Sequence, residues 1–216
     1  MTASQPCFAV IPCFNEAATI GGVVRGVAPL VAGVIVVDDG SADATAAAAQ
    51  SAGGTVLRHA ANRGKGAALL SGARRAEELG AVWLLFLDGD GQHDPADAAR
   101  LLAVAGGEDL LIGNRMADAA GMPPLRRAVN RFLSRDLARR SGRAVPDSQC
   151  GLRLVHVAAW RRLDLPALRF ETESEMILAA AAAGLRLGWV PVPVRPRKGG
   201  RSHIRPLGDT WRWWCW

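Results

Sequence analysis

Short apolar runs alternate with helical patterns along almost the whole chain, and this alternation limits the possible fold more than any other feature. It is typical of a sheet covered by helices, and it excludes a helical bundle and a β-sandwich. The expected strands are Cys7–Ile11, Val34–Asp38, Thr55–Arg58, Val82–Asp88, Leu110–Gly113, Leu152–Val155 and Leu187–Val194. The expected helices are Ala17–Ala28, Ala42–Ala52, Gly64–Leu79, Pro95–Ala105, Leu125–Ser141 and Thr172–Ala183.

Polar side chains cluster directly after the ends of the expected strands. The clusters are Asn15-Glu16, Asp38-Asp39, Asp88–Asp94 and Asn114-Arg115. In an open α/β sheet, ligands bind in the crevice outside the carboxyl ends of the strands. The sequence therefore predicts that the chemistry of this chain gathers at one edge of the sheet.

The strongest motif is FLDGDGQHDP, residues 86–95, in which a buried strand delivers two carboxylates into a glycine-containing turn. Asp88, Asp90 and the amide of Gln92 are hard oxygen ligands of the kind that Mg²⁺ or Mn²⁺ prefers. A metal there would neutralise the charge of a departing diphosphate. The alternative is an acidic turn, and we expect that role only for Asp94, as the cap of a helix that starts at Pro95.

A second strand ends in Asp38 and Asp39, followed by a Gly-Ser turn into a helix. Ser41 or Asp43 is expected to cap that helix. Capping leaves the two preceding acids unexplained. A carboxylate at this position can accept a hydrogen bond from the N–H of a nucleobase, which contributes about 1.5–3 kcal/mol.

Two further turns carry weaker signals. Phe14 can stack on a base and Glu16 can accept from base or ribose, although Asn15 and Glu16 are equally compatible with an ordinary helix start. The NRGKG turn places Arg63 and Lys65 at the beginning of a helix, where a phosphate can bind. Its spacing differs from that of a Walker A loop.

In this order, the motifs resemble family 2 glycosyltransferases, especially the dolichol-phosphate mannose or glucose synthase branch. The resemblance continues through GNR (113–115), DSQCGLR (147–153), RFETE (169–173) and VPV (190–192) to the segment from Arg197 to His203, and so covers residues 8 to about 205. It implies an α/β fold of the GT-A (Rossmann-like) type that binds a nucleotide sugar on a mostly parallel central sheet flanked by helices. It also implies one domain over 1–216, with a nucleotide-sugar-binding half (1–115), an acceptor-binding half (116–205) and a Trp-rich C-terminal tail (206–216).

The resemblance also implies roles for single residues. Those that bind the nucleotide sugar are Pro12, Phe14, Glu16, Asp39, Lys65, Asp88, Gly89, Arg115 and Arg197. The metal ligands are Asp88, Asp90 and Gln92, and the acceptor-binding residues are Arg115, Arg197, Ser202 and His203. The catalytic residues are Asp90, Glu173 and Asp147. The chain departs from the family at Phe14, where Tyr is usual, and at His203, where the polyprenol-phosphate branch usually has Lys.

The implied reaction is an inverting, metal-dependent transfer of a hexose from a UDP- or GDP-linked donor. A hydroxyl acceptor requires a general base, for which Glu173 and Asp147 are better candidates than Glu171. A polyprenyl phosphate is already anionic and requires cations instead, and the many arginines of the acceptor half favour it. The alternative role of the acids at 171, 173 and 175 is structural, because the helix dipole favours negative charge in the first turn of a helix. A soluble hydroxyl or glycan acceptor remains the alternative, followed by a non-catalytic nucleotide-sugar-binding protein.

Positive charge is concentrated in one expected helix. The chain has 26 Lys and Arg against 20 acids, and residues 126–143 contain seven arginines and one acid. Arg127, Arg131, Arg135 and Arg139 form a stripe. Val129, Phe132, Leu133 and Leu137 are expected to supply apolar contacts around it. Such a helix can bind an anionic membrane surface, or it can be a solvated face on a core-packed helix.

The remaining features concern location and partners. Trp211, Trp213, Trp214 and Trp216 can sit at a lipid interface or dock on the sheet. Four cysteines without a paired spacing indicate a reduced compartment, and Cys13 and Cys150 are expected to be small buried residues. We expect a cytoplasmic protein without a signal peptide, peripheral at the cytosolic membrane face. A basic pI fits nucleic acid, but no nucleic-acid-binding motif is present. The base, the sugar and the oligomeric state are left open.

Overall fold

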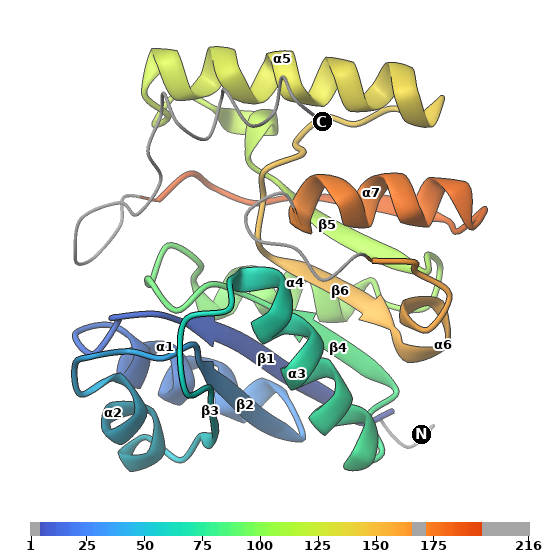
Figure 1. Cartoon of the computed structure of the whole chain (residues 1–216). Helices are drawn as coiled ribbons and strands as arrows, with labels where there is room; N and C mark the ends of the chain where they lie inside the picture. The colour runs from blue at the N-terminus through green and yellow to red at the C-terminus, as the bar shows by residue number, and fades with distance from the viewer. Residues whose placement is uncertain (1–4, 166–171, 196–216) are drawn as a thin grey trace.

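A seven-stranded sheet runs through residues 5–165 and 172–195, the part of the chain that the computed structural model describes (Figure 1). Its strand order is β3-β2-β1-β4-β6-β5-β7. The strands are β1 (Cys7–Cys13), β2 (Gly33–Asp38), β3 (Thr55–Arg58), β4 (Trp83–Phe86), β5 (Leu110–Asn114), β6 (Arg153–His156) and β7 (Leu187–Pro191). All seven expected strands form, and the mostly parallel α/β sheet is confirmed.

Only β6 runs against the other strands of the described sheet. It is antiparallel to both of its neighbours, β4 and β5, whereas the remaining pairs are parallel. The other six strands therefore point the same way, and their carboxyl ends lie at one edge. Because β6 is reversed, the segment that enters it, residues 147–152, also lies at that edge. The direction of β6 was not predicted from the sequence.

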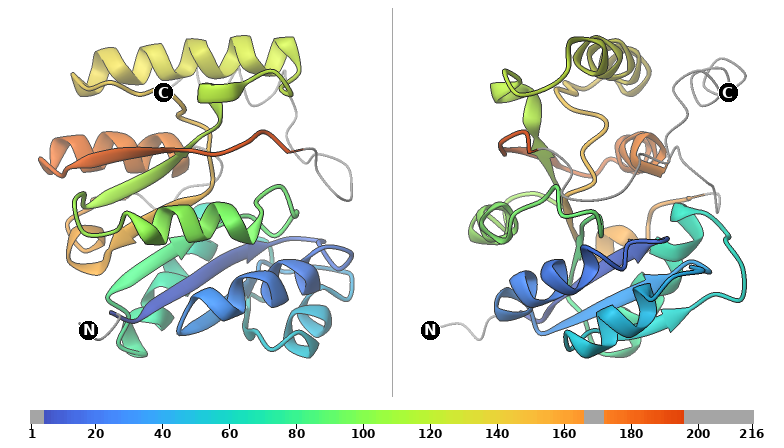
Figure 2. Two further views of the ribbon diagram at one scale, coloured as in Figure 1. Left: turned by 180° about the vertical axis from the view of Figure 1, so that it is seen from behind. Right: turned by 90° about the vertical axis from the view of Figure 1, so that its left-hand side faces the viewer.

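The helices cover both faces of the sheet. The right-hand view of Figure 2 shows α1 and α4 on one side of the sheet and α3 and α7 on the other. The helices are α1 (Ile20–Val27), α2 (Thr45–Ser51), α3 (Lys65–Glu78), α4 (Pro95–Ala103), α5 (Pro124–Ser141), α6 (Val157–Trp160) and α7 (Thr172–Ala182), with short 3-10 turns η1 (Ala28–Leu30) and η2 (Arg115–Asp118). All six expected helices form. The turns η1 and η2 and the one-turn helix α6 were not predicted.

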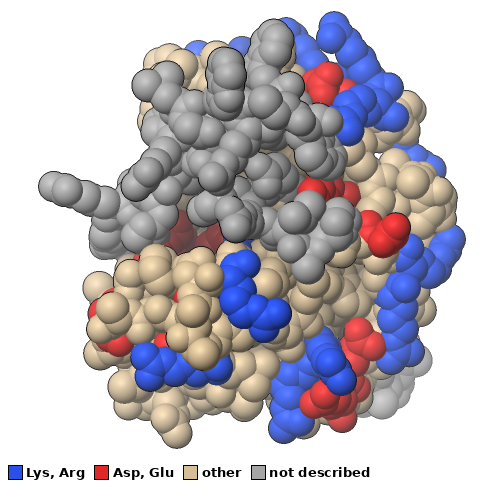
Figure 3. Space-filling view, viewed as in Figure 1, with Lys and Arg blue, Asp and Glu red and all other residues tan. Residues whose placement is uncertain are grey.

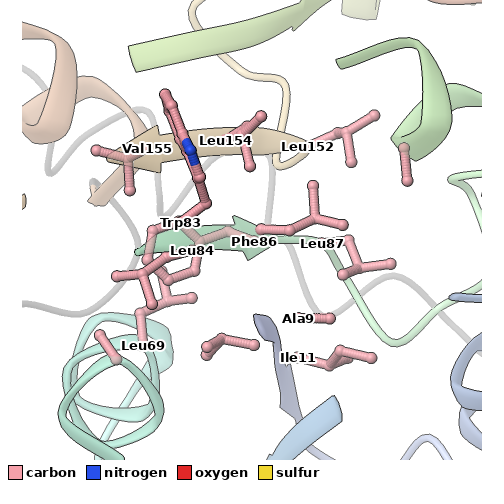
Figure 4. Close-up of a cluster of buried hydrophobic side chains, with 14 of the residues drawn as sticks. Ala9, Ile11, Leu69, Trp83, Leu84, Phe86, Leu87, Leu152, Leu154 and Val155 are labelled. Atoms are coloured by element: carbon pink, nitrogen blue, oxygen red, sulfur yellow. The ribbon is translucent and has the colours of Figure 1, made fainter. Parts of the chain in front are cut away.

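The core lies where β1 and β4 meet α3 and β6 (Figure 4). The central strands are buried on both faces, so their sequences are continuous apolar runs such as WLLF in β4. Ile11, Leu84 and Leu154 are fully buried there. Burying a side chain of this size stabilises the fold by about 1.5–3 kcal/mol. Within the described residues, no helix is long and apolar enough to cross a membrane.

Two helix starts test the expected caps. The Asp94 side chain accepts from the Ala96 amide and forms a capping box with Asp97, as predicted for the start of α4. At the start of α2, Ala44 holds the N-cap position, and the Asp43 carboxylate accepts from the amide of Thr45, the first residue of the helix, at 3.0 Å. Asp43 therefore serves this helix start as predicted, and Ser41 does not. The Ser41 hydroxyl is used elsewhere, as an acceptor from a backbone amide in the loop after β1.

Candidate active site

The loops after β1 and β2 are joined by hydrogen bonds. The Ser41 hydroxyl accepts from the Asn15 amide at 2.9 Å, and the Asn15 side chain accepts from the Ala42 amide at the same distance. The Thr45 hydroxyl accepts from the Glu16 amide at 2.8 Å. Asn15 has a positive φ of 55°, a conformation that Asn tolerates better than most residues. These bonds fix the loop after β1 against the loop after β2.

Three predicted nucleotide-binding residues lie in or beside this joined region. Pro12 and Phe14 are half-buried, and Glu16 is buried. The Thr19 hydroxyl donates to the carbonyl of Gly89 at 2.8 Å, which ties the same loop to the turn after β4. The structure therefore brings Pro12, Phe14 and Glu16 close to the predicted metal-binding turn. Their contact with a nucleotide stays a prediction.

Asp39 is held by three donors. Its Oδ1 accepts from the Arg63 amide at 2.9 Å, and its Oδ2 accepts from the Gly64 amide at 2.8 Å. The Nδ1 atom of His59 lies 2.6 Å from Oδ1. Only 4% of Asp39 is exposed. Its carboxylate therefore connects the end of β2 with the loop that leads into α3.

Sequence reasoning missed His59 and Ser71, which extend this contact into a chain. The Nε2 atom of His59 lies 3.0 Å from the Ser71 hydroxyl in the middle of α3. An ionised carboxylate only accepts, so Nδ1 carries the proton and donates to Asp39, and Nε2 is left to accept from Ser71 when the ring is neutral. The spacing of these residues gives no signal, because three different elements bring them together.

Lys65 joins the two halves of the site. Its ammonium group contacts one carboxylate oxygen of Asp88 and one of Glu173, at the start of α7. Burial alone would raise the pKa of Asp88, but Lys65 and its other cationic neighbours lower it to about 2. Burial alone would likewise lower the pKa of Lys65, and the two carboxylates raise it. Lys65 and Asp88 are therefore both charged near neutral pH.

Two glycines permit close approaches at this edge. A Cβ atom on Gly151 would lie 2.4 Å from the Asp88 carboxylate, and one on Gly89 would lie 2.5 Å from the sulfur of Cys13. A small cavity lies beside Gly151, and its charged lining residues are Lys65, Asp88, Arg153 and Glu173. Gly89 was predicted as a nucleotide-sugar residue, and the structure gives it a packing reason. Cys13 and Cys150 are buried, as predicted.

The predicted metal ligands follow β4 in one turn. Asp90 accepts from the Gln92 amide at 2.9 Å, and the Gln92 side chain donates to the Arg195 carbonyl at 3.2 Å. Burial lowers the pKa of neighbouring His93 to about 4, so this ring is neutral near pH 7. Within the described residues, no three His, Cys, Asp or Glu side chains form a metal-binding group. Two carboxylates and one amide still match the oxygen donors of Mg²⁺ or Mn²⁺, provided that a ligand such as diphosphate completes the shell.

Arg115 and Asp147 form a buried pair at the same edge of the sheet. The guanidinium donates to both Asp147 oxygens at 2.9 Å, and the Arg115 amide donates to Oδ2. Asn130 and the Gln149 amide donate to Oδ1 at 2.8 and 3.1 Å. Burial alone would raise the pKa of Asp147, but its hydrogen bonds from Arg115 lower it. Five donors and complete burial fix this carboxylate in place.

Arg153 was also missed by sequence reasoning. It is 1% exposed, and its guanidinium donates to the carbonyls of Cys150, Ser148 and Glu173. It therefore ties the start of α7, which carries Glu173, to the segment that leads into β6. The matching motif was visible in the sequence, but its contacts depend on the reversal of β6.

Most of the basic stripe of α5 is open to solvent, although Arg127 is half-buried, and one correction applies to its expected surroundings. Arg131, Arg135 and Arg139 are exposed. Leu133 and Leu137 are buried as expected, whereas Val129 and Phe132 are 39% and 60% exposed and pack little against the core. The inner face of α5 uses Asn130 and Ser134 instead. Arg197, Ser202, His203 and the four C-terminal tryptophans lie outside the described residues.

Comparisons with known protein sequences identify the family of this chain. The family model of glycosyl transferase family 2 matches residues 8–163. The UDP-N-acetylglucosamine–dolichyl-phosphate N-acetylglucosaminyltransferase of Methanococcus voltae is 30% identical over 215 residues, which cover 88% of this chain and 86% of that protein. The undecaprenyl-phosphate mannosyltransferase of Micrococcus luteus is also 30% identical and covers 90% and 86%.

The fold is also similar to solved structures. Glucosyl-3-phosphoglycerate synthase from Mycobacterium tuberculosis, in complex with Mn²⁺, UDP-glucose and phosphoglyceric acid, has a TM-score of 0.73 and 22% identity. The likeness covers 96% of this chain and 75% of that one. The sheet, the order of the motifs and the matched family model lead to one conclusion: the chain is a member of glycosyltransferase family 2, with the GT-A fold that its sequence predicts.

Proposed function

We propose that this chain is an inverting hexosyltransferase that moves a sugar from a UDP- or GDP-linked donor to a polyprenyl phosphate. The observation that carries the proposal is the set of half-buried and buried charges at the carboxyl edge, where Lys65 joins Asp88 to Glu173 and Arg115 pairs with Asp147. The relatives from M. voltae and M. luteus, which carry dolichyl phosphate and undecaprenyl phosphate in their names, support a lipid-phosphate acceptor.

On the donor side, Asp39 accepts from the nucleobase, and Pro12, Phe14 and Glu16 surround the nucleoside. Asp88, Asp90 and Gln92 would hold a divalent metal together with the diphosphate of the donor. When bound, this metal supplies positive charge to the departing diphosphate. Lys65 lies on the same carboxylate as the predicted metal and adds a second cation at the diphosphate.

On the acceptor side, we assign different roles to the two candidate bases. Asp147 accepts five hydrogen bonds and is fully buried, so its role is to position Arg115 for a phosphate. Glu173 is held by Lys65 and lines the cavity, where it can take a proton if the acceptor is a hydroxyl. An acceptor phosphate is already ionised and needs no base. Arg197, Ser202 and His203 complete the acceptor contacts in this proposal.

The surface of α5 supports a location at an anionic membrane. Leu125, Val129 and Phe132 recur at positions i, i+4 and i+7, so they share one face, and all three are exposed. The arginines of residues 126–143, less one acid, carry as much positive charge as the net +6 of the whole chain. Figure 3 shows Lys and Arg at the upper end of the molecule, which carries α5, and also along its right-hand side and at the opposite end. Exposed apolar side chains flanked by cations are what an anionic lipid surface binds.

The position of α5 also connects that surface with the site. Arg126, in the first turn of α5, is an exposed residue, and partial desolvation lowers the pKa of its guanidinium. It interacts electrostatically with Arg115, Asp90, Asp147 and Asp88. A lipid phosphate bound beside Arg126 would therefore be close to both the membrane-facing side of α5 and the donor. This continuity favours a lipid acceptor over a soluble one.

A soluble acceptor is the second candidate, because the similar synthase from M. tuberculosis was solved with phosphoglyceric acid. The two are separated by supplying the purified protein with Mn²⁺ and labelled UDP-glucose or GDP-mannose. Short-chain polyprenyl phosphate in detergent is one acceptor, and phosphoglyceric acid is the other. Label in the lipid phase supports the proposal. Label only in the soluble product supports the second candidate, and donor binding without transfer to either supports a nucleotide-sugar-binding protein.

A further inference from the structure

A buried polar network connects α5 with the Asp147 carboxylate. The Asn130 side-chain amide donates to Asp147 Oδ1 at 2.8 Å, and the Ser134 hydroxyl, one turn further along α5, lies 3.0 Å from Asn130 Oδ1. Ser134 also meets the backbone amide and the hydroxyl of Ser148, at 2.9 and 3.1 Å. Asn130 and Ser134 are each 3% exposed, and Asp147 and Ser148 are fully buried. Burying four polar side chains costs desolvation free energy, which their hydrogen bonds must offset.

The ionised carboxylate sets the direction of the bonds in this network. A carboxylate oxygen only accepts, so the Asn130 side chain must present its nitrogen to Asp147 and its oxygen to Ser134. That amide oxygen also only accepts, so the single hydroxyl proton of Ser134 is donated to it. Ser134 is then left to accept from Ser148, whose hydroxyl accepts in turn from the Gln149 side chain at 3.1 Å. These donors therefore all point along the network toward Asp147.

The network bears on Arg115 because Asp147 joins the two. The Arg115 guanidinium donates from Nε to Oδ2 and from Nη2 to Oδ1, both at 2.9 Å. Oδ1 is also the oxygen to which Asn130 donates. Since the guanidinium is planar and makes two parallel bonds, its orientation follows that of the carboxylate. A carboxylate that lost the Asn130 bond could turn, and the Arg115 charge would turn with it.

Packing alone does not explain an amide at position 130. The inner face of α5 already buries the leucines at 133 and 137. A third apolar side chain at 130 would pack there without the desolvation free energy of an amide. The contact that Asn130 makes with Asp147 is what an apolar residue could not supply.

We propose that Asn130 is a positioning residue of the site, which fixes the Asp147 carboxylate and through it the Arg115 cation for a phosphate ligand. This inference rests on the proposed function, in which Arg115 receives the acceptor phosphate. Asn130 lies between Val129 and Arg131, on the helix whose exposed face we propose to bind an anionic membrane. One helix then carries both the lipid-facing surface and the residue that sets the phosphate-binding cation.

The test compares Asn130→Asp and Asn130→Leu with wild type. Asp keeps the shape of Asn but places a second carboxylate against Asp147, and Leu keeps a similar volume without a donor. We expect both variants to raise the KM for a short-chain polyprenyl phosphate about fivefold to tenfold, with kcat changing by less than about twofold. Calorimetric titration of the same phosphate, in detergent, should show a matching rise in Kd.

The matched control is Leu137→Ala in the same helix. Leu137 is fully buried and has no polar atom in its side chain. Its truncation leaves a cavity and lowers the melting temperature, but the hydrogen bonds to Asp147 remain. Below the melting transition, its KM for the phosphate should equal that of wild type. Thermal unfolding shows which variants are folded, and either Asn130 variant is sufficient for the comparison.

The outcomes separate this inference from the proposed function. A rise in KM that Leu137→Ala does not share supports the inference. If Leu137→Ala raises KM equally, or if the Asn130 variants change only the melting temperature, Asn130 is structural and the inference falls. If wild type binds phosphoglyceric acid instead of the lipid, the proposed acceptor is wrong, and the same comparison with phosphoglyceric acid decides the inference. If wild type binds neither phosphate, both are wrong.

Discussion

The two edges of the sheet carry the same kind of ion pair in opposite surroundings. At the carboxyl edge, Arg115 and Asp147 form a two-pronged pair whose side chains are 12% and 0% exposed. At the amino edge, Arg186 and Asp109, just before β7 and β5, form a similar pair that is 64% and 28% exposed. The chemistry is the same, and only the burial differs.

The difference in burial shows where folding includes an unfavourable desolvation free energy. An exposed pair contributes about 0–1 kcal/mol, and salt screens it. A buried pair must be desolvated, and replacing it with apolar residues is often neutral or stabilising. The pair at the carboxyl edge, together with Lys65, Asp88 and Glu173, is therefore poorly explained by stability alone. A site that must hold anionic ligands explains it better.

The largest effect is expected for Asp90→Asn. This change removes one carboxylate of the predicted metal site and keeps the shape of the side chain. Metal-dependent turnover should fall by about 10³-fold, because the metal supplies several kcal/mol of charge stabilisation. Sugar transfer is measured across a Mn²⁺ titration, and thermal unfolding checks the fold.

The amino edge offers a control for this change. Asp109→Asn also neutralises one acid, but far from the predicted site, and it should leave turnover unchanged. Full activity of Asp90→Asn at every Mn²⁺ concentration would remove Asp90 from the metal site. The carboxyl edge would then no longer differ from the amino edge in its effect on turnover.

The next effect concerns Asp147→Asn, which tests whether the buried pair positions Arg115. Breaking a buried pair costs about 3–5 kcal/mol, so the free energy of unfolding should fall by this amount. If Asp147 positions Arg115, the KM for the acceptor phosphate should rise about tenfold while kcat changes less. A general base would instead show a large loss of kcat with KM unchanged. Asp109→Asn, in the exposed pair, should change stability by less than about 1 kcal/mol.

The sequence predicted the local features of the site better than its long-range contacts. The strands, the six expected helices and the loops after β1, β2 and β4 follow from local patterns, since apolar runs and glycine turns are recognised within a few residues. Asp94 as a cap is an example. By contrast, the Lys65–Glu173 contact spans 108 positions, and the Arg153 contacts depend on the direction of β6. Long-range pairing of this kind leaves no periodic signal in a single sequence.

The chain of Asp39, His59 and Ser71 shows the same limit at closer range. The sequence predicted that Asp39 serves a ligand, because capping did not explain it. It did not predict His59, which lies 20 positions away at the end of another strand, or Ser71, which looks like an ordinary helical residue. The motif therefore locates the carboxylate predicted to bind a ligand, and only the fold gives the groups that hold it.

A smaller effect is expected at α5, beyond the carboxyl edge. The double change Arg131→Gln and Arg135→Gln should reduce binding to anionic vesicles by about tenfold or more, since each cation contributes about 1 kcal/mol. Donor affinity should not change. Co-sedimentation with phosphatidylcholine vesicles, with and without phosphatidylglycerol, measures the effect.

Matched variants make the vesicle experiment specific. Arg74→Gln with Arg75→Gln removes two exposed cations from α3 and should leave vesicle binding close to wild type. Phe132→Ser should weaken binding through its exposed apolar side chain, whereas Leu79→Ser, at the end of α3, should not. If the α5 variants and their α3 counterparts lose vesicle binding equally, the exposed surface of α5 is only a solvated face.

The smallest effect is expected for Asp94→Ala, which separates two kinds of acid within one motif. Asp94 lies four residues after Asp90, yet its carboxylate accepts from the Ala96 amide and forms a capping box at the start of α4. Losing such a cap costs about 1 kcal/mol, which lowers the melting temperature of a domain of this size by about 2–4 °C. Turnover below the melting transition should match wild type. A loss of turnover comparable to that of Asp90→Asn, without a change in melting temperature, would place Asp94 in the site and extend the functional edge into α4.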